Sequence, residues 1–234
     1  MKNFAFCTLA YGDRYRKFSH SLISQLNEFG YHVFILTDNV KEYNKTDLLT
    51  PIEYEKSFFS FHEKRTIVRE CLKYFDTAIF LDADVYISGI QDLDIFASID
   101  PGLHIFGSFG DLSIHFLNGD FGKFVPGCFR NGHYGNLGLD FLKEKNLEYT
   151  QLYHNNTVEG YLTHFLEGRW ILKKENGKEN IFFDKWDLLA SFTDKIDIEL
   201  GFKNQIGAGE GSHMSIAAKN SGISVHNLSP IYPF

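Results

Sequence analysis

Continuous apolar runs and helical patterns of apolar residues follow one another in a regular order along the first ninety residues. The run FAFCTLAY (Phe4–Tyr11) is short, apolar and rich in aromatic residues, and a Gly-Asp pair follows it, which predicts a buried strand. Apolar residues then recur three and four positions apart from residue 15 to residue 29, and Gly30 ends this helical pattern. The run YHVFILTD (Tyr31–Asp38) predicts the next strand.

A second helix and a third strand are predicted between residues 60 and 87. Ser60 stands three residues before Glu63, the spacing of a capping box, and apolar residues follow at helical spacing as far as Phe75. The strand AIFL then leads into the sequence DADVYI. Strand–helix–strand units repeated in this way predict an α/β fold whose central sheet is doubly wound, mostly parallel and flanked by helices.

The pattern is looser after residue 100. We expect a helix after residue 154, followed by a strand–turn–strand around the pair Asn176-Gly177. Ser212 is in a position to begin a short helix that ends at Gly222, and ISVHNL predicts a final strand. The chain of 234 residues fits one domain, 1–234, with a smaller mixed region in its second half.

The composition and the net charge argue against several classes of function. The net charge of -7 and the pI near 5.8 argue against a nucleic-acid binder, so we expect no nucleic-acid partner. The three cysteines are widely spaced, without a CxxC pair, which predicts neither a zinc site nor a disulfide framework and favours a reducing compartment. No apolar stretch has the length of a signal peptide or a membrane span, so we expect a cytoplasmic protein without a transmembrane segment.

Asp82 and Asp84 are the main candidates for chemistry. Residues two apart in a strand point to the same side, so two neighbouring carboxylates would repel each other unless a cation lay between them. Carboxylates without a nearby Cys or His set favour a hard cation, Mn²⁺ or Mg²⁺, which binds through one or two carboxylates and substrate phosphates. The alternative is that both residues only cap the next turn.

A cation held by these carboxylates would bind a substrate diphosphate at the edge of the α/β sheet. Among the reactions of such a diphosphate, this favours the transfer of a sugar from a nucleotide-sugar. A divalent ion stabilises the negative charge that collects on the departing diphosphate. The strand ends containing Thr8 to Tyr11 and Asp38 would supply the nucleoside pocket, because ligands bind beyond the carboxyl ends of parallel strands. A sugar-nucleotidyltransferase is an alternative among enzymes, and a non-catalytic carbohydrate- or nucleotide-binding protein of the same fold is the alternative from a different class.

Four stretches of the chain resemble a known enzyme family. These are NFAFCTLAY, LDADVYI, GDFGKFVPGCFRNG and EGSHMSIAAKNSGISVHNLSPIY. Together they resemble the GT-A glycosyltransferases, with FLDADV as the Asp-x-Asp motif. More narrowly they resemble glycosyltransferase family 6, the histo-blood-group A/B and α-1,3-galactosyltransferase group. The resemblance implies a GT-A-like sheet with a nucleotide-binding half, residues 1–100, and a donor-sugar and acceptor half, residues 101–234.

The resemblance also implies roles for individual residues. Those at the nucleotide would be Thr8, Ala10, Tyr11, Asp38, Arg65 and Asp82, and those at the donor sugar Lys64, Val125, Pro126, Gly127 and Cys128. The acceptor would meet His213, and the metal would be held by Asp82, Asp84 and His226, the last because some GT-A families place a histidine ligand on a late strand. Glu210 would be the catalytic carboxylate, although the order Glu-Gly-Ser-His leaves open that another carboxylate has this role.

The expected activity is a metal-dependent, retaining transfer of a hexose from a UDP-sugar to a glycan or glycolipid. Galactose or N-acetylgalactosamine is the favoured hexose, and a peripheral membrane contact is compatible with a glycolipid acceptor. Glu210 either forms a glycosyl-enzyme intermediate or stabilises a cationic sugar while the acceptor attacks from the same face. A glycogenin-like or lipopolysaccharide galactosyltransferase-type enzyme is the alternative, and a late histidine ligand would favour it.

Overall fold

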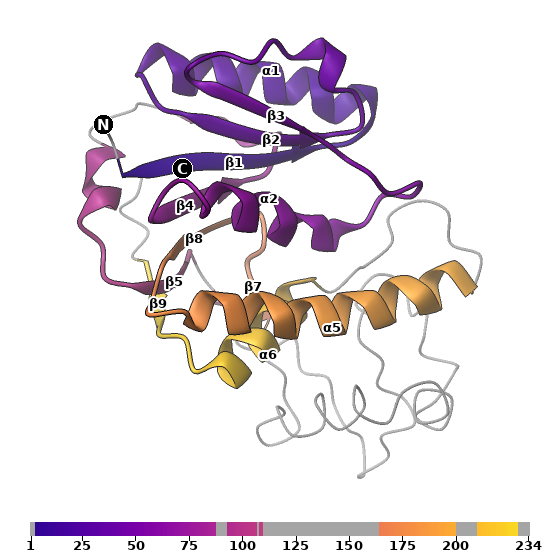
Figure 1. Ribbon diagram of the computed structural model, residues 1–234, viewed down its shortest axis with the longest axis vertical. Helices are drawn as coiled ribbons and strands as arrows, with labels where there is room; N and C mark the ends of the chain where they lie inside the picture. The colour runs from indigo at the N-terminus through magenta and orange to yellow at the C-terminus, as the bar shows by residue number, and fades with distance from the viewer. Residues whose placement is uncertain (1–2, 88–92, 107, 110–163, 200–209, 229–234) are drawn as a thin grey trace.

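The structure is a computed structural model that describes residues 3–87, 93–106, 108–109, 164–199 and 210–228 (Figure 1). Its centre is a seven-stranded sheet in the order β3-β2-β1-β4-β8-β5-β9. The strands of this sheet are β1 (Phe4–Ala10), β2 (Val33–Thr37), β3 (Leu49–Glu53), β4 (Thr77–Leu81), β5 (Gly102–Ile105), β8 (Arg169–Lys173) and β9 (Val225–Asn227). All of them run in one direction except β8, which is antiparallel to both β4 and β5.

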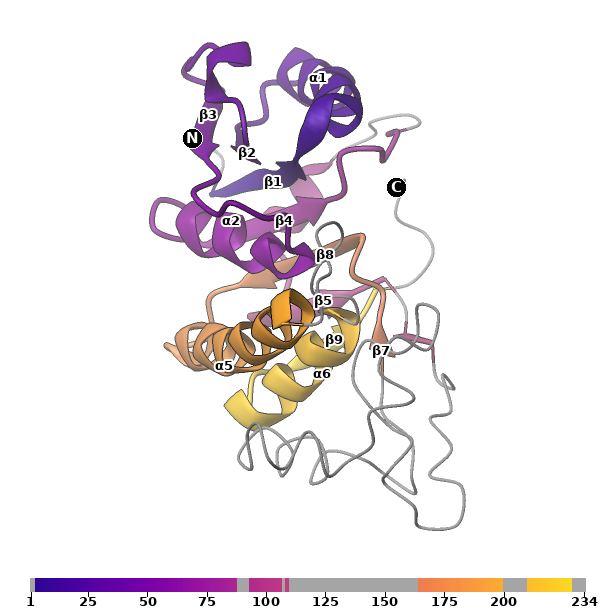
Figure 2. The same ribbon diagram turned by 90° about the vertical axis from the view of Figure 1, so that its right-hand side faces the viewer.

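Helices cover both faces of the sheet, as Figure 2 shows. They are α1 (Gly12–Glu28), α2 (Lys64–Cys71), α5 (Lys178–Glu199) and α6 (Glu210–Ser221), joined by the 3₁₀ turns η1 (Val40–Glu42), η2 (Phe61–Glu63) and η3 (Leu93–Ala97). A separate two-stranded ladder pairs β6 (Ser108–Phe109) with β7 (His164–Phe165). The prediction of an α/β fold with a mostly parallel sheet flanked by helices is confirmed.

Two apolar cores lie on opposite sides of the sheet because strand residues point alternately to either face. One core joins α1 to alternate residues of β1, including Phe4 and Phe6, and of β2. The other joins α2, α5 and α6 to the intervening residues, including Cys7 and Leu9. Apolar residues on both faces explain why the strands appear in the sequence as continuous apolar runs.

The strand order reverses between β1 and β4. From β1 the chain moves outward to β2 and β3, and it then returns to place β4 on the other side of β1. In open α/β sheets, a crevice forms where the connections from neighbouring strands leave to opposite sides, beyond the carboxyl ends of the strands. Asp82 directly follows the carboxyl end of β4, so the aspartate pair lies at this reversal point.

The predictions for individual segments after residue 100 are only partly confirmed. Of the strand–turn–strand expected around Asn176-Gly177, the first strand (β8) and the turn are confirmed, but the second strand is wrong, because the helix α5 begins at Lys178. Ser212 does not begin α6, which starts at Glu210, but the helix does end before Gly222, whose φ of 66° favours glycine. The final strand β9 is present, and the helix expected after residue 154 lies outside the described residues.

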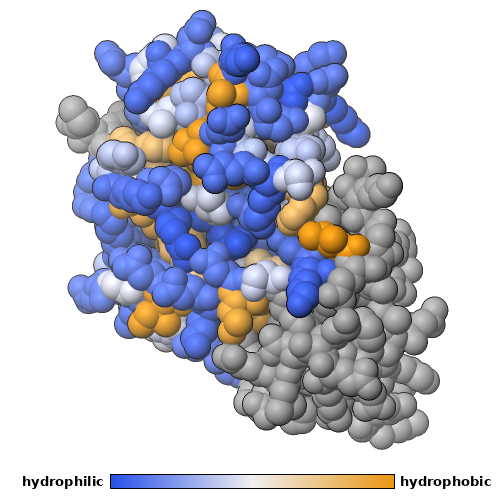
Figure 3. Space-filling model, turned by 45° about the vertical axis from the view of Figure 1, so that its right-hand side comes forward, coloured by the Kyte–Doolittle hydropathy of each residue, from blue (hydrophilic) through white to orange (hydrophobic). Residues whose placement is uncertain are grey.

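The described helices include none that is long and apolar enough to cross a lipid bilayer. The described part of the surface is mainly hydrophilic, with isolated apolar side chains, as the view in Figure 3 shows. Single exposed apolar residues of this kind are normal for a folded domain.

Candidate functional site

A cavity of about 200 Å³ opens at the reversal point of the sheet. Its acidic lining residues are Asp82, Asp84, Glu167 and Glu210, and Lys64 is the basic one; Leu9, Tyr11, Tyr15, Phe59, Phe61 and Ala83 complete the described lining. These residues come from β1, α1, the segment before α2, the turn after β4, the turn before β8 and the first residue of α6. Elements far apart in the sequence therefore meet at one cleft.

Lys64 lies at the centre of the carboxylates. Its Nζ atom is 3.0 Å from Asp82 Oδ1 and 3.5 Å from Glu210 Oε1, and it donates to the Glu167 carbonyl oxygen at 3.4 Å. The Lys64 and Glu210 side chains are only 5% and 4% exposed, whereas the Asp82 side chain is 35% exposed. The lysine thus joins a buried carboxylate to one that faces the cavity.

Burial and neighbouring charges shift the pKa values of Lys64, Asp82 and Glu210 in opposite directions. Burial alone would lower the pKa of Lys64, but attraction to Asp82, Glu210 and Glu167 outweighs it, and the net pKa is raised. Burial raises the pKa of Asp82 and of Glu210, and Lys64 only partly offsets this. Lys64 therefore stays charged, and the site holds two carboxylates that accept a proton more readily than ordinary ones.

Gly168 leaves room for the Asp82 carboxylate. A Cβ atom placed on Gly168 would lie 2.9 Å from Asp82 Oδ2, closer than real Cβ contacts. The Asp82 amide also donates to the Gly168 carbonyl oxygen at 2.8 Å. Asp82 is consequently held against the turn before β8 on one side and by Lys64 on the other.

Replacing Gly168 with Ala is therefore expected to displace the Asp82 carboxylate with little loss of stability, because the end of a side chain can shift. With Mn²⁺ as the probe, we expect a divalent cation at Asp82 to bind about 10- to 100-fold more weakly, as for other misplaced groups in binding sites. Calorimetric titration and a thermal melt measure the two effects separately. A large drop in the melting temperature with unchanged Mn²⁺ affinity would contradict the role given to Gly168.

The aspartate pair fits a hard divalent cation. Both carboxylates line the cavity, and Asp84 is exposed. Within the described ranges, no group of three or more His, Cys, Asp and Glu residues is arranged to hold a metal ion. Mg²⁺ and Mn²⁺ commonly complete a two-carboxylate site with water and substrate phosphate oxygens, so the residues present suffice for such an ion.

Tyr11, Phe59 and Phe61 form an aromatic wall in the lining of the cavity. Tyr11 packs against Tyr54 and Phe59, with ring centroids 5.1 Å apart in each case, and Phe59 contacts Phe61 at 4.9 Å. Lys56 and Ser60 anchor this segment to α5, because both donate to the buried Asp194 carboxylate, at 3.0 and 2.8 Å. The wall is therefore a fixed apolar surface suited to a flat ring.

The residues predicted at the nucleoside do not all reach the cavity. Tyr11 lines it, but the side chains of Thr8 and Ala10 point to the opposite face of the sheet, toward α1. Asp38 accepts from the Gly12 amide at 3.1 Å and from Arg16 at 2.6 Å. It thus holds the N-terminus of α1 and is not among the described lining residues.

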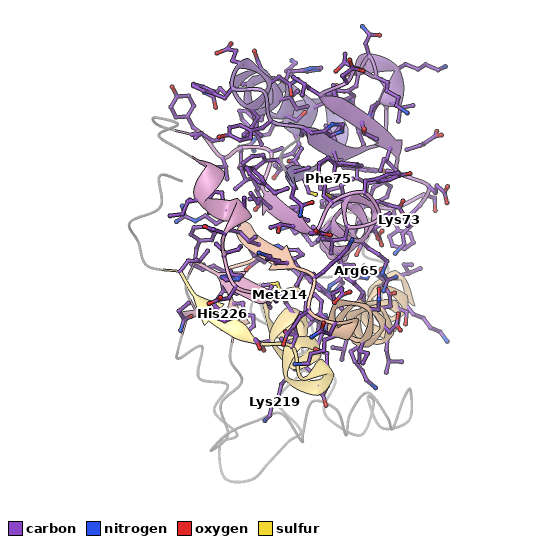
Figure 4. All side chains as sticks on the ribbon, turned by 60° about the vertical axis from the view of Figure 1, so that its left-hand side comes forward. Arg65, Lys73, Phe75, Met214, Lys219 and His226 are labelled. Carbon is purple, nitrogen blue, oxygen red and sulfur yellow. The ribbon has the colours of Figure 1, made fainter. Side chains whose placement is uncertain are left out.

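Arg65 also points away from the cavity. It pairs with Asp187 of α5 and donates to the His62 carbonyl oxygen at 2.6 Å. Figure 4 shows Arg65 beside α5. The predicted contact with the nucleotide is replaced by a link between α2 and α5, because one helical position separates Arg65 from Lys64 and turns its side chain to another neighbour.

His213 is fully buried and does not line the described cavity. Its Nδ1 atom is 3.0 Å from Nε2 of His62, which is also fully buried and whose Nδ1 accepts from the Trp186 indole at 3.0 Å. The His213 side chain therefore points into the core, and the structure does not bring it to the place predicted for an acceptor.

Stability is expected to fall in acid because of His62. Burial first, and then the neighbouring His213 and Arg65, hold the pKa of His62 well below its ordinary value, so protons bind more readily to the unfolded chain. The contribution of His62 to the free energy of unfolding is complete above about pH 6.5. Below this pH the free energy of unfolding should decrease, by up to about 2 kcal/mol at pH 5. Denaturant unfolding of wild type and His62→Gln between pH 7.5 and 5 measures the difference, and parallel curves would contradict it.

His226 lies far from the aspartate pair. Its Nε2 is 3.1 Å from the Pro101 carbonyl oxygen, at the amino end of β5, and its ring stacks on His104. Three strand spacings, about 14 Å, separate β9 from β4. The predicted third metal ligand is therefore not brought to Asp82 and Asp84; Figure 4 shows His226 on β9.

The predicted donor-sugar residues Val125, Pro126, Gly127 and Cys128 lie outside the described residues. Lys64, Asp82, Asp84 and Glu210 do meet at the cavity, together with Glu167, Phe59 and Phe61, which the sequence interpretation missed. Glu167-Gly168 is a turn before an apolar run, and this signal points to the site only if β8 is known to pair with β4.

Comparison with known proteins adds no family to this picture. No model of a known protein family matches the chain, and no curated protein sequence is significantly similar to it.

Proposed function

We propose that this protein is a metal-dependent, retaining glycosyltransferase with a GT-A-like fold. It would move a hexose, galactose or N-acetylgalactosamine being favoured, from a UDP-sugar to a glycan or glycolipid. The observation that carries the proposal is the meeting of Asp82, Asp84 and Glu210 around Lys64, at the reversal point of an α/β sheet. This is where such sheets bind nucleotides.

The aromatic wall favours the binding of a nucleoside at one end of the cavity. Tyr11 and Phe59 line the cavity, and the stacking of a base on an aromatic side chain is worth about 1–3 kcal/mol per base in other proteins. A base held on this side places its diphosphate toward Asp82 and Asp84.

The charges support a requirement for a divalent cation. The described lining contains four acidic residues and one lysine, so a diphosphate would be repelled unless a cation entered with it. Asp84 and the exposed side of Asp82 would hold that ion, whose chemistry is to stabilise the negative charge of the departing diphosphate. Lys64 holds Asp82 in its orientation through the 3.0 Å ion pair.

Glu210 is the carboxylate placed to stabilise positive charge on the sugar. In the transfer, the bond from the anomeric carbon to the diphosphate oxygen breaks and its electron pair leaves with UDP. The acceptor oxygen then bonds to the anomeric carbon and gives up its proton to the leaving diphosphate. A buried carboxylate beside the developing cation lowers the barrier by electrostatic stabilisation.

Turnover of UDP-hexoses with Mn²⁺ tests the proposal. Purified protein should release UDP from UDP-galactose, UDP-N-acetylgalactosamine or UDP-glucose, and Glu210→Gln should lower the rate by about 100- to 1,000-fold. UDP affinity should stay within about threefold of wild type. Glu179→Gln is the matched control, because Glu179 is a buried carboxylate of α5 outside the described cavity lining. Absence of both turnover and Mn²⁺-dependent UDP binding would refute the proposal.

The excess of acidic residues favours one second candidate, a non-catalytic protein that binds an organic cation. Aromatic rings beside carboxylates attract ammonium groups through charge and cation–π contacts. Titration with spermidine separates the candidates: binding of spermidine, together with no effect of UDP and Mn²⁺, would support the second.

A further inference from the structure

A pair of buried histidines lies directly behind the cavity. His62 belongs to η2, two residues before Lys64, and His213 belongs to the first turn of α6, three residues after Glu210. Both side chains are fully buried, and their rings stack with centroids 4.6 Å apart. The hydrogen bond between them therefore joins the two backbone segments that carry Lys64 and Glu210.

The hydrogen bonds of His62 determine which of its nitrogens carries the proton. An indole nitrogen can only donate, so Nδ1 of His62, 3.0 Å from Trp186 Nε1, must be the acceptor. The proton of neutral His62 is then on Nε2, which donates to Nδ1 of His213 at 3.0 Å. His62 accepts from α5 and donates to α6 at the same time, which a protonated ring could not do.

The surroundings keep His62 in this neutral form. Burial contributes most, and His213 and the cations Arg65, Lys56 and Lys64 act in the same direction, so that the pKa of His62 is well below its ordinary value. Glu63 and Asp194 pair with Lys56, and Asp187 pairs with Arg65, so these carboxylates already have cationic partners.

We propose that His62 and His213 are positioning residues, which fix the separation of the Lys64 ammonium and the Glu210 carboxylate from behind the cavity. This role deepens the proposed function and rests on it for its catalytic consequence. The two charged groups are 3.5 Å apart and come from segments 146 positions apart in the chain. The histidine bond lies within one helical turn of each of them, so its loss lets α6 shift relative to the start of α2.

Two substitutions at His62 distinguish the contribution of its hydrogen bonds from that of its ring. In His62→Gln the amide oxygen can accept from Trp186 and the amide nitrogen can donate to His213, so kcat should stay within about threefold of wild type. His62→Leu has neither group, and kcat should fall by about 100-fold while KM for the UDP-sugar changes less than threefold. Equal kcat values for Leu and wild type would overturn the proposal, and so would equal losses for Gln and Leu.

Nitrogen NMR of the whole protein gives a readout that does not depend on activity. The ¹⁵N shifts of His62 should show the proton on Nε2 at pH 7.5, and Trp186→Phe should release this preference. The Lys64 Nζ resonance should move in His62→Leu but not in His62→Gln. If the wild type has no transferase activity, the proposed function fails, and the Lys64 resonance alone decides the positioning role. A proton on Nδ1, or a Lys64 resonance unchanged in His62→Leu, would overturn it.

Should His62→Leu fail to fold, Trp186→Phe tests the same pair with a smaller change. It removes the hydrogen bond that sets the tautomer and keeps an aromatic ring in the core. We expect a mixture of His62 tautomers and a fall in kcat of about 10-fold with KM unchanged. A single unchanged tautomer with wild-type kcat would count against the proposal.

Discussion

Asp84→Asn is expected to weaken UDP binding in the presence of Mn²⁺ by at least about 100-fold. Replacing groups that only support a metal ligand costs 10- to 100-fold in affinity, and a direct ligand should cost at least as much. The Asp84 side chain is exposed, so the substitution should leave the melting temperature unchanged. Calorimetric titration of UDP with and without Mn²⁺ measures the loss.

The matched control for this prediction is Asp184→Asn. Asp184 is an exposed carboxylate of α5 whose partner is Arg69, outside the described cavity lining. Its substitution should change neither UDP affinity nor the Mn²⁺ requirement. Wild-type affinity in Asp84→Asn, or UDP binding that is the same without Mn²⁺, would remove the support for a metal site.

Lys64→Met is expected to destabilise the fold by about 3–5 kcal/mol at pH 7, because it leaves the buried Glu210 carboxylate without its cation. Without Lys64, the pKa of Glu210 in the folded protein should rise further above its unfolded value. Protonation then relieves the defect, so the destabilisation should be smaller at pH 5 than at pH 7. Denaturant unfolding at the two pH values measures the effect.

A double variant distinguishes lost charge pairing from lost packing. Lys64→Met combined with Glu210→Gln removes both charges and should recover a large part of the loss, since two neutral groups replace an unpaired ion. Lys73→Met is the control, because Lys73 forms a surface pair with Glu70, and its replacement should cost less than about 1 kcal/mol. A double variant no more stable than Lys64→Met would contradict the electrostatic explanation.

The position of the aspartates could be predicted because it depends only on neighbours in the sequence. An apolar strand followed by Asp82 and Asp84 places both at the carboxyl end of that strand, whatever the rest of the chain does. For the nucleoside contacts, the prediction followed the resemblance and did not apply the alternation of strand residues. Strand alternation puts Leu9 and Tyr11 on the cavity side and Thr8 and Ala10 on the side of α1, but the resemblance alone groups Thr8, Ala10 and Tyr11.

The side-chain partners of charged residues could not be predicted. Lys64 and Arg65 are adjacent and look alike in the sequence, yet the first meets Asp82 and Glu210 and the second meets Asp187 of α5. The difference depends on which elements pack on either side of α2. His226 is likewise placed by the pairing of β9 with β5, which nothing in its own neighbourhood specifies.

The sequence by itself determined the α/β class, the strands β1, β2 and β4, the helices α1 and α2, and the place of the carboxylate pair, because hydrophobic period and turn residues act over a few positions. Only the tertiary structure decided that β8 runs antiparallel between β4 and β5, and that Lys64 lies between Asp82 and Glu210. Contacts between distant segments depend on the packing of the whole sheet and its helices, and no local pattern records them.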